Sequence, residues 1–315
     1  MNNNFLNDID KGLSNTPKYL LSKYFYDKKG DALFVDIMNM PEYYLTRAEF
    51  DIFKNQTQNI IEGLQLNKDT FFELIELGAG DGTKTKELLK VLDTEKYNFN
   101  YIPIDISQNA LDQLKESVNT ELPHVKTTTK QGDYFEVLGS LKQSNHPKII
   151  LFLGSNIGNL SDALAKDFLT KLSDSLKSND KVLLGLDLIK SKNIVLPAYN
   201  DSQGITKRFN LNLLDRINNE FGADFDTDLF IHQPEYTEEE GIARSYLVST
   251  ISQNVTIKSL NKTFHFVEGE RIHTETSRKY NDTILNSYLE NTSLKIIDKL
   301  IDSKQYFADY ILDKK

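Results

Sequence analysis

The sequence contains no cysteine and no tryptophan, and only 5 of its 315 residues are histidines. Without cysteine, the protein cannot form disulfide bonds, thiolate nucleophiles or cysteine-based zinc sites. The histidines do not show the spacing of metal ligands, so the sequence predicts no bound metal. A chain without cysteine also fits the reducing cytoplasm, where disulfides rarely form.

Long apolar runs and an excess of positive charge are missing as well. The longest apolar runs, 149–153 and 182–186, have the length of strands and are far too short to span a membrane. The first residues lack the basic-then-apolar pattern of a signal peptide. The net charge is −9, which favours neither a nucleic acid nor an anionic membrane as partner. With no heptad seam, the sequence predicts a cytoplasmic monomer.

Short apolar runs alternate with longer amphipathic segments in the middle of the chain. We expect strands at 71–77, 99–105, around Val125, 148–154 and 181–187, and helices at 83–92, 109–120 and 162–176. This order predicts an α/β fold, a doubly wound, Rossmann-like sheet that is mostly parallel and covered by helices on both faces.

The rhythm changes on either side of this region. Residues 1–60 are predicted to be helical, and 190–290 combine a helix with several strand-like runs, as expected of an inserted α+β domain. Two strand-like runs near the end of the chain predict a hairpin that adds two strands to the first sheet, one of them antiparallel. We therefore expect a discontinuous domain of 60–190 plus 290–315 and an inserted domain of 190–290.

A glycine-rich loop, ELGAGDGTKTKELL (76–89), joins the first predicted strand to a helix. Gly78, Gly80 and Gly82 permit positive φ angles and a close approach of the backbone to a ligand. Asp105 ends the next strand, where a carboxylate can accept hydrogen bonds from ribose, and Asp133 and Tyr134 follow the third strand, where they can hold adenine. The sequence therefore predicts an adenosine-binding loop.

The spacing of the loop is G-x-G-x-G, which differs from the G-x-G-x-x-G of dinucleotide-binding oxidoreductases. The loop also lacks a Walker sequence for triphosphates. S-adenosylmethionine carries an adenosine and no phosphate, so it fits this pattern best. The alternatives are a nucleotide-dependent oxidoreductase and a tight turn without a ligand.

Several longer motifs show that the chain resembles the histidine Nα-methyltransferases of ergothioneine biosynthesis and their relatives that methylate other amino-acid amines. The resemblance extends from about Pro17 to the final hairpin. Its markers are YFYDKKG (24–30), PEYYLTRAE (41–49), ELGAGDGTKT (76–85), FLGSNIGNL (152–160), AYNDSQGITKRFNLNLLDRINNEFGADFD (198–226) and HTETSRKY (273–280).

The resemblance implies a methyltransferase domain interrupted by a substrate-binding domain, with residues 1–60 contributing to the substrate pocket. It also implies S-adenosylmethionine as cofactor, S-adenosylhomocysteine as product and no metal. The reaction it implies is methylation of the α-amine of L-histidine, three times in succession, which gives hercynine (trimethylhistidine).

Roles for single residues follow from the same resemblance. The cofactor would be bound by Gly78, Gly80, Gly82, Lys84, Asp105, Asp133 and Tyr134. The backbone part of the amino acid would be bound by Tyr43, Asn159 and Tyr199, and its imidazole by Glu275 and Ser277. Tyr26 would line the same pocket and, with Tyr43 and Asn159, act at the reacting amine.

One position departs from the family pattern. Ser245 stands where histidine-specific members often carry a methionine, and a small polar residue changes both the volume and the polarity of a pocket. Histidine remains the leading predicted substrate. The alternatives are a methyltransferase for another amino acid or aromatic amine, and a binding module that has lost the chemistry.

Overall fold

A computed structural model describes residues 3–133, 139 and 144–314. The chain divides into two units, which are described separately. The seven-stranded unit comprises Leu45–Ile189 and Lys279–Lys315, and the four-stranded unit comprises Met1–Tyr44 and Lys190–Arg278. Each unit is therefore built from two separate stretches of sequence.

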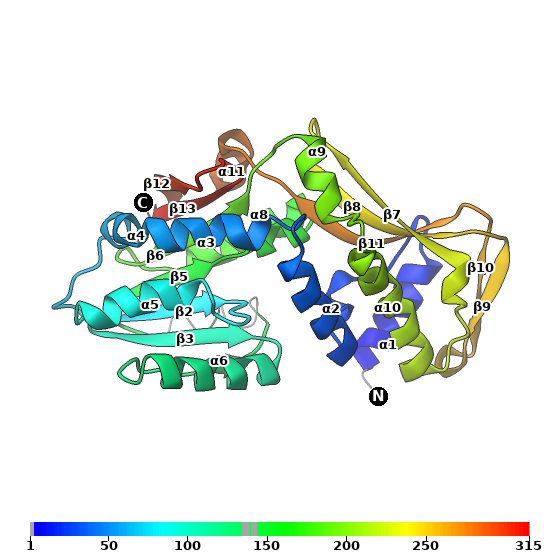
Figure 1. The fold of residues 1–315 in the computed structure, drawn as a ribbon, viewed down its shortest axis with the longest axis horizontal. Helices are drawn as coiled ribbons and strands as arrows, with labels where there is room; N and C mark the ends of the chain where they lie inside the picture. The colour runs from blue at the N-terminus through cyan, green and yellow to red at the C-terminus, as the bar shows by residue number, and fades with distance from the viewer. Residues whose placement is uncertain (1–2, 134–138, 140–143, 315) are drawn as a thin grey trace. The chain divides into compact units, whose positions relative to one another are not determined.

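The sheet of the seven-stranded unit has the order β12-β13-β6-β5-β2-β3-β4 (Figure 1). Its strands are β2 (Phe72–Leu77), β3 (Phe99–Asp105), β4 (Lys130–Gln131), β5 (Lys148–Phe152), β6 (Lys181–Asp187), β12 (Leu294–Ile301) and β13 (Phe307–Lys314). Strands β4, β3, β2, β5 and β6 run parallel to one another, whereas β13 is antiparallel to both β6 and β12. The predicted C-terminal hairpin and its antiparallel strand are thus confirmed.

Helices cover both faces of this sheet, and each face has its own apolar core. One core includes residues of α3 (Leu45–Asn55), α4 (Thr57–Gly63), α5 (Thr85–Thr94) and α6 (Gln108–Glu121). The other core includes residues of α8 (Asp162–Ser175) and α11 (Asp282–Leu289). Figure 1 shows α5 and α6 running alongside β2 and β3. The predicted doubly wound α/β fold is confirmed.

The strands predicted at 99–105 and 181–187 have the predicted bounds, whereas the strand expected around Val125 is reduced to an isolated parallel bridge, in which Thr127 pairs with Tyr101 of β3. Val125 lies in a turn, where its N–H bonds to the carbonyl of Leu122, and the edge strand β4 comes five residues later at Lys130–Gln131. Both β4 residues are exposed. An edge strand of two exposed residues needs no apolar run, so hydrophobic pattern could not locate it.

The four-stranded unit contains a sheet of order β1-β11-β8-β7 and a separate β10-β9 hairpin. Its strands are β1 (Lys18–Tyr19), β7 (Phe230–Thr237), β8 (Ile242–Ser249), β9 (Gln253–Ile257), β10 (Lys262–Phe266) and β11 (Arg271–Arg278). Its helices are α1 (Asn3–Ser14), α2 (Lys28–Asn39), α9 (Lys192–Val195) and α10 (Ile205–Phe221). Helix α10 packs against α2, β7 and β8, and the core between them is rich in phenylalanine.

The unit boundaries differ from the domain ranges expected from the sequence. Residues 45–60 belong to the seven-stranded unit, because α3 packs on β13 and α5. Residues 1–44 do not form a helical segment of their own, because β1 pairs in parallel with β11. The pairing of two residues with a strand about 250 positions away leaves no periodic signal in the sequence. The assignment of substrate binding to one unit stays a prediction.

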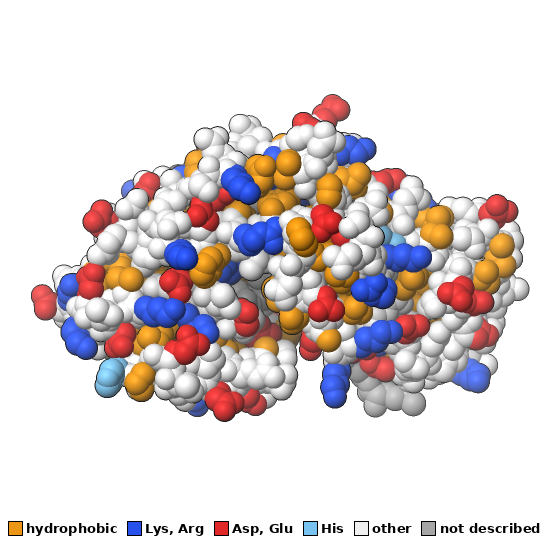
Figure 2. Space-filling model, in the orientation of Figure 1, with side chains coloured by type: hydrophobic (Ala, Val, Ile, Leu, Met, Phe, Trp, Pro, Cys, Tyr) orange, Lys and Arg blue, Asp and Glu red, His pale blue; other side chains and the backbone are white. Residues whose placement is uncertain are grey.

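Acidic and basic side chains lie interspersed on the face of the molecule shown in Figure 2. This distribution accompanies the net charge of −9. Within the described ranges, no helix combines the length and apolar character needed to cross a bilayer.

Candidate active site

The glycine-rich loop lies between β2 and α5, at the carboxyl edge of the parallel strands. Gly78, Gly80 and Gly82 all have positive φ angles, between 54° and 71°, as the sequence predicts. A Cβ at Gly82 would overlap Leu114 of α6, whereas a Cβ at Gly80 would have no heavy atom within 4 Å. The loop is therefore packed at Gly82 and open at Gly80, where a ligand could approach the backbone.

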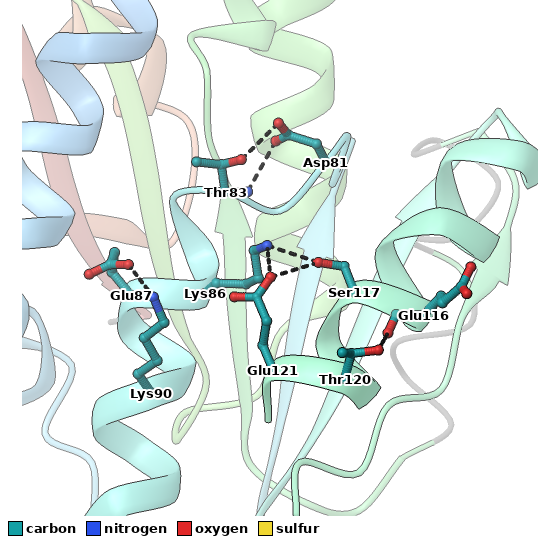
Figure 3. A network of polar contacts seen from close by, with 9 residues as sticks. All are labelled: Asp81, Thr83, Lys86, Glu87, Lys90, Glu116, Ser117, Thr120 and Glu121. Atoms are coloured by element: carbon teal, nitrogen blue, oxygen red, sulfur yellow. Dashed lines mark hydrogen bonds and ion pairs between the residues drawn. The ribbon is translucent and has the colours of Figure 1, made fainter. Parts of the chain in front are cut away.

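Side-chain hydrogen bonds hold the end of this loop (Figure 3). The Asp81 carboxylate accepts the backbone N–H of Thr83 at 3.0 Å and its hydroxyl at 2.7 Å. In the first turn of α5, Lys86 donates to Ser117 at 2.9 Å and to Glu121 at 2.6 Å, both on α6. These contacts fix the loop and the start of α5 against α6.

Asp105, at the end of β3, lies next to the open part of the loop. Its Oδ2 accepts the N–H of Gly80 at 3.2 Å, and its Oδ1 accepts the N–H of Ser107 at 3.0 Å. The structure thus brings together Gly80 and Asp105, which the sequence predicts to bind the same adenosine. Asp133 is exposed after β4, and Tyr134 lies outside the described residues.

A buried acid in β2 contacts the start of α5, next to the glycine loop, and was not among the predicted site residues. Glu76 is in β2, two residues before Gly78, and accepts hydrogen bonds from Thr85 at 2.7 Å and from the Tyr101 hydroxyl. Burial raises the pKa of Glu76 to about 7, although both hydrogen bonds oppose this rise. The only signal in the sequence was a carboxylate within the apolar run FFELIEL.

Lys84, predicted to contact the cofactor, precedes α5 and forms an ion pair with Glu49 of α3. Glu49 is fully buried and was not among the predicted site residues. It could have been noticed because it interrupts the apolar stripe of its helix.

Asn159 ends a short 3₁₀ helix, η2 (Asn156–Asn159), in the turn after β5. The turn begins with Gly154 and Ser155, both in left-handed conformations. Ser155 is buried, and its hydroxyl accepts the N–H of Asp187 at 3.0 Å. Because β5 neighbours β2, Asn159 and the glycine loop follow adjacent strands at one edge of the sheet.

The predicted imidazole-binding residues lie in the four-stranded unit. Ser245 of β8 pairs with Glu275 of β11, and its hydroxyl donates to Glu275 Oε2 at 3.0 Å. Ser277 follows two positions later, on the same face of β11. A bulge at Thr274 puts this threonine in contact with Asn210 of α10, at 2.7 Å, and with the Ser245 carbonyl, at 3.1 Å. The structure therefore brings Ser245, Glu275 and Ser277 together.

Three tyrosines were also predicted to bind substrate, and two of them share an aromatic cluster. Tyr26 and Tyr43 each make an edge contact with Phe34 of α2, with ring centroids 5.5 and 6.4 Å apart. Tyr26 also contacts Phe209 of α10. Tyr199 is buried after η3 (Leu196–Ala198), and its carbonyl oxygen lies 2.8 Å from Nε2 of His232. A substrate role for these residues remains a prediction.

The two histidines that are most buried are held in the neutral form. Burial lowers the pKa of His232 and of His273, because a charged imidazolium would lose its hydration. Among the described residues, no group of three or more histidines or acids could hold a metal ion.

The residues of the seven-stranded unit fit S-adenosylmethionine. Gly80 is open, as a close approach of the adenosine requires, and Asp105 presents a carboxylate beside it that can accept ribose hydroxyls. The sequence after Gly82 forms no Walker loop, so this arrangement favours a ligand without a triphosphate.

Comparison with known proteins agrees with this geometry. The family described as "Histidine-specific methyltransferase, SAM-dependent" matches residues 5–314. The histidine N-alpha-methyltransferase of Mycolicibacterium smegmatis is 36% identical over 273 residues, which cover 87% of this chain and 83% of that protein. Its counterpart in Mycobacterium tuberculosis is 34% identical over 287 residues, covering 91% of this chain and 88% of that protein.

A relative of lower sequence identity is named for another substrate. The 4-dimethylallyltryptophan N-methyltransferase of Claviceps fusiformis is 28% identical over 201 residues, covering 61% of this chain and 56% of that protein. The match to the family over nearly the whole chain and the two mycobacterial relatives agree with the motifs and the glycine loop. The chain belongs to the family of histidine-specific, S-adenosylmethionine-dependent methyltransferases.

Proposed function

We propose that this protein methylates the α-amine of L-histidine, in up to three successive transfers that yield trimethylhistidine. The observation that carries the proposal is the Ser245–Glu275–Ser277 group on β8 and β11. A carboxylate has about four lone-pair positions, so Glu275 can accept the bond from Ser245 and an imidazole N–H as well. The names of the two mycobacterial relatives support the same substrate.

The chemistry requires little besides alignment. S-adenosylmethionine would supply a methyl group on a sulfonium, with S-adenosylhomocysteine as the leaving group. The residues of the site would align an uncharged amine with that methyl group, and the amine would release a proton to solvent before each further transfer. Asn159, Tyr43 and Tyr199 would bind the backbone part of the amino acid with uncharged hydrogen-bonding groups. They add no cation that would repel the sulfonium. Glu275 and Ser277 would select the side chain, because a substrate without ring nitrogens leaves a carboxylate unpaired.

Product mass after incubation with S-adenosylmethionine and each amino acid in turn tests this proposal. We expect a gain of three methyl groups with histidine alone. Glu275→Gln should lower kcat/KM for histidine by roughly 10- to 100-fold, which corresponds to one charge-assisted hydrogen bond. Glu240→Gln is the matched control, because this exposed carboxylate pairs with Arg244 on the same sheet. No methylation of histidine, or equal rates for the two variants, would contradict the proposal.

A second substrate class has its own support. Ser245 stands where the family often carries a larger apolar residue. The rings around Phe34 form an aromatic cluster. The Claviceps relative is named as a methyltransferase of 4-dimethylallyltryptophan, an aromatic amino acid. We therefore include aromatic amino acids in the panel. If one of them gains methyl groups and histidine does not, Ser245→Met should shift the preference toward histidine.

A further inference from the structure

Glu49 is an ionisable side chain in an apolar environment. It lies on the same stripe of α3 as the core residues Leu45, Ala48, Ile52 and Phe53, and it is 0% exposed. A buried carboxylate without partners costs several kcal/mol, so such a residue persists only where it is paired and hydrogen-bonded. The groups that Glu49 contacts therefore indicate its role.

Both oxygens of Glu49 accept the backbone N–H of Gly154, at 2.9 and 3.0 Å. The same carboxylate forms an ion pair with Lys84. Gly154 begins the turn that leads to Asn159, and Lys84 ends the glycine loop. One side chain thus connects the segments that follow the neighbouring strands β2 and β5.

The sheet is built to leave room for this carboxylate. Gly185 is in the middle of β6, where a Cβ would overlap Glu49 Oε1 and lie 3.0 Å from Asp309 Oδ1. Burial and the nearby charge of Glu49 raise the pKa of Asp309 well above its ordinary value. Of these two acids, Glu49 is the one that forms the ion pair with Lys84.

The part of the cofactor that best suits Lys84 is its carboxylate. An ammonium group has hydrogen-bond donors and no acceptor, and S-adenosylmethionine has a single anionic group, the carboxylate of its methionyl end. Burial would lower the pKa of Lys84, but Glu49 keeps it above its ordinary value, so the ammonium stays charged. A flexible lysine held in one place loses less entropy when it binds a ligand.

We propose that Glu49 is a positioning residue for the cofactor. It holds the Lys84 ammonium where this group binds the methionyl carboxylate, and it fixes the turn after β5 through Gly154. Glu49 itself does not touch the cofactor. The affinity for ligands that carry the methionyl carboxylate should therefore depend on Glu49 through Lys84.

Isothermal titration calorimetry with two ligands tests this proposal. S-adenosylhomocysteine carries the methionyl carboxylate, and 5′-methylthioadenosine lacks the whole amino-acid end. Glu49→Gln and Lys84→Met should each weaken S-adenosylhomocysteine binding by roughly 10-fold or more, the value of a charge-assisted hydrogen bond. Binding of 5′-methylthioadenosine should stay within about 2-fold of the wild type. The double variant should bind S-adenosylhomocysteine no more weakly than Lys84→Met.

Lys90→Met is the matched control, because Lys90 lies on α5 beyond its first turn and pairs with Glu87 of the same helix at 2.7 Å (Figure 3). It should leave both affinities unchanged. Wild-type binding by Glu49→Gln would overturn the proposal, and so would an equal loss for both ligands, which indicates a purely structural role. Losses that multiply in the double variant would also overturn it, because Glu49 would then act independently of Lys84.

Glu49→Gln could prevent folding, in which case Glu49→Asp replaces it. The shorter side chain keeps the charge but reaches less far, so the same selective loss for S-adenosylhomocysteine is expected. Equal affinity of Glu49→Asp and the wild type for that ligand would overturn the proposal.

Discussion

The two units bury polar side chains of different kinds. Among the described residues, the buried ionisable side chains of the seven-stranded unit are Glu49, Glu76, Lys148, Asp180, Lys181, Asp187, Lys279, Asp302 and Asp309. In the four-stranded unit only Asp201 belongs to this class, and the other buried polar side chains there are neutral, such as Asn210, Ser245 and Thr274.

The two units therefore stabilise their buried polar groups in different ways. Burying ions costs stability unless each is paired, and the pairs of the seven-stranded unit include Glu49 with Lys84 and Asp187 with Lys279 at the ends of its strands. The four-stranded unit uses hydroxyl and amide groups, which are cheaper to bury when they are hydrogen-bonded. The predicted cofactor side thus buries ion pairs, whereas the predicted substrate side buries neutral hydrogen-bonded groups around one carboxylate.

The largest effect should come from breaking a buried ion pair. Lys279 and Asp187 are both 0% exposed and 2.8 Å apart. Lys279→Met removes the cation beside Asp187 and should lower the free energy of unfolding by about 3–5 kcal/mol. Hydrogen exchange should show faster opening of peptides from β6 and β13. The double variant Asp187→Leu/Lys279→Met should recover much of the lost free energy of unfolding. If Lys279→Met is as stable as the wild type, the buried ion pairs do not distinguish the two units in the way described.

A smaller, pH-dependent effect is expected at Glu76. Its pKa is about 7 in the folded protein and ordinarily 4.5, so the folded state keeps a proton that the unfolded state has lost. This contribution to stability is complete below pH 4.5 and is lost as the pH rises to about 7. Over that range it amounts to roughly 3 kcal/mol.

Glu76→Gln should remove this dependence. Urea unfolding of both proteins at pH 5 and pH 7.5 measures it, and the wild type should lose more stability than the variant between the two values. An identical pH dependence of the two proteins would show that Glu76 ionises normally.

The smallest loss of stability is expected in the four-stranded unit, at Asp201, which is its one buried acid among the described residues. Asp201 accepts the N–H groups of Ile205 and Thr206, both at 2.8 Å, in the first turn of α10. Asp201→Ala should cost about 1–2 kcal/mol, the usual value of a helix cap. Asp201→Asn should lose part of this stability, because its single amide oxygen can replace only one of the two carboxylate oxygens that accept these bonds. Thermal unfolding at pH 7 compares the three proteins.

The cap should also weaken in acid. Burial alone would raise the pKa of Asp201, but the two N–H bonds keep it below its ordinary 3.8. Its contribution is therefore present above pH 3.8 and is lost as the pH falls further. The difference in unfolding temperature between the wild type and Asp201→Ala should therefore become smaller below pH 3.8. A difference that stays constant with pH would mean that the charge of Asp201 does not contribute to stability.

Local pattern was enough for most of the seven-stranded unit, which is predicted to bind the cofactor. Strands β3 and β6, the glycine loop and the C-terminal hairpin were predicted because runs of buried residues and glycines at fixed spacing are properties of adjacent residues. The proximity of Asp105 to Gly80 followed from the parallel order of β2 and β3. The edge strand β4 was misplaced because it buries nothing.

The sequence by itself determined the sheet, the loop and, through its motifs, the family. Only the tertiary structure decided that Glu49 holds Gly154 across 105 residues, that β1 pairs with β11, and that Ser245 bonds to Glu275. These contacts join side chains or strands that are far apart in the chain. In the local sequence, Glu49, Ser245 and Glu275 are ordinary polar residues. They gain their roles only when folding removes water and brings their partners within hydrogen-bonding distance.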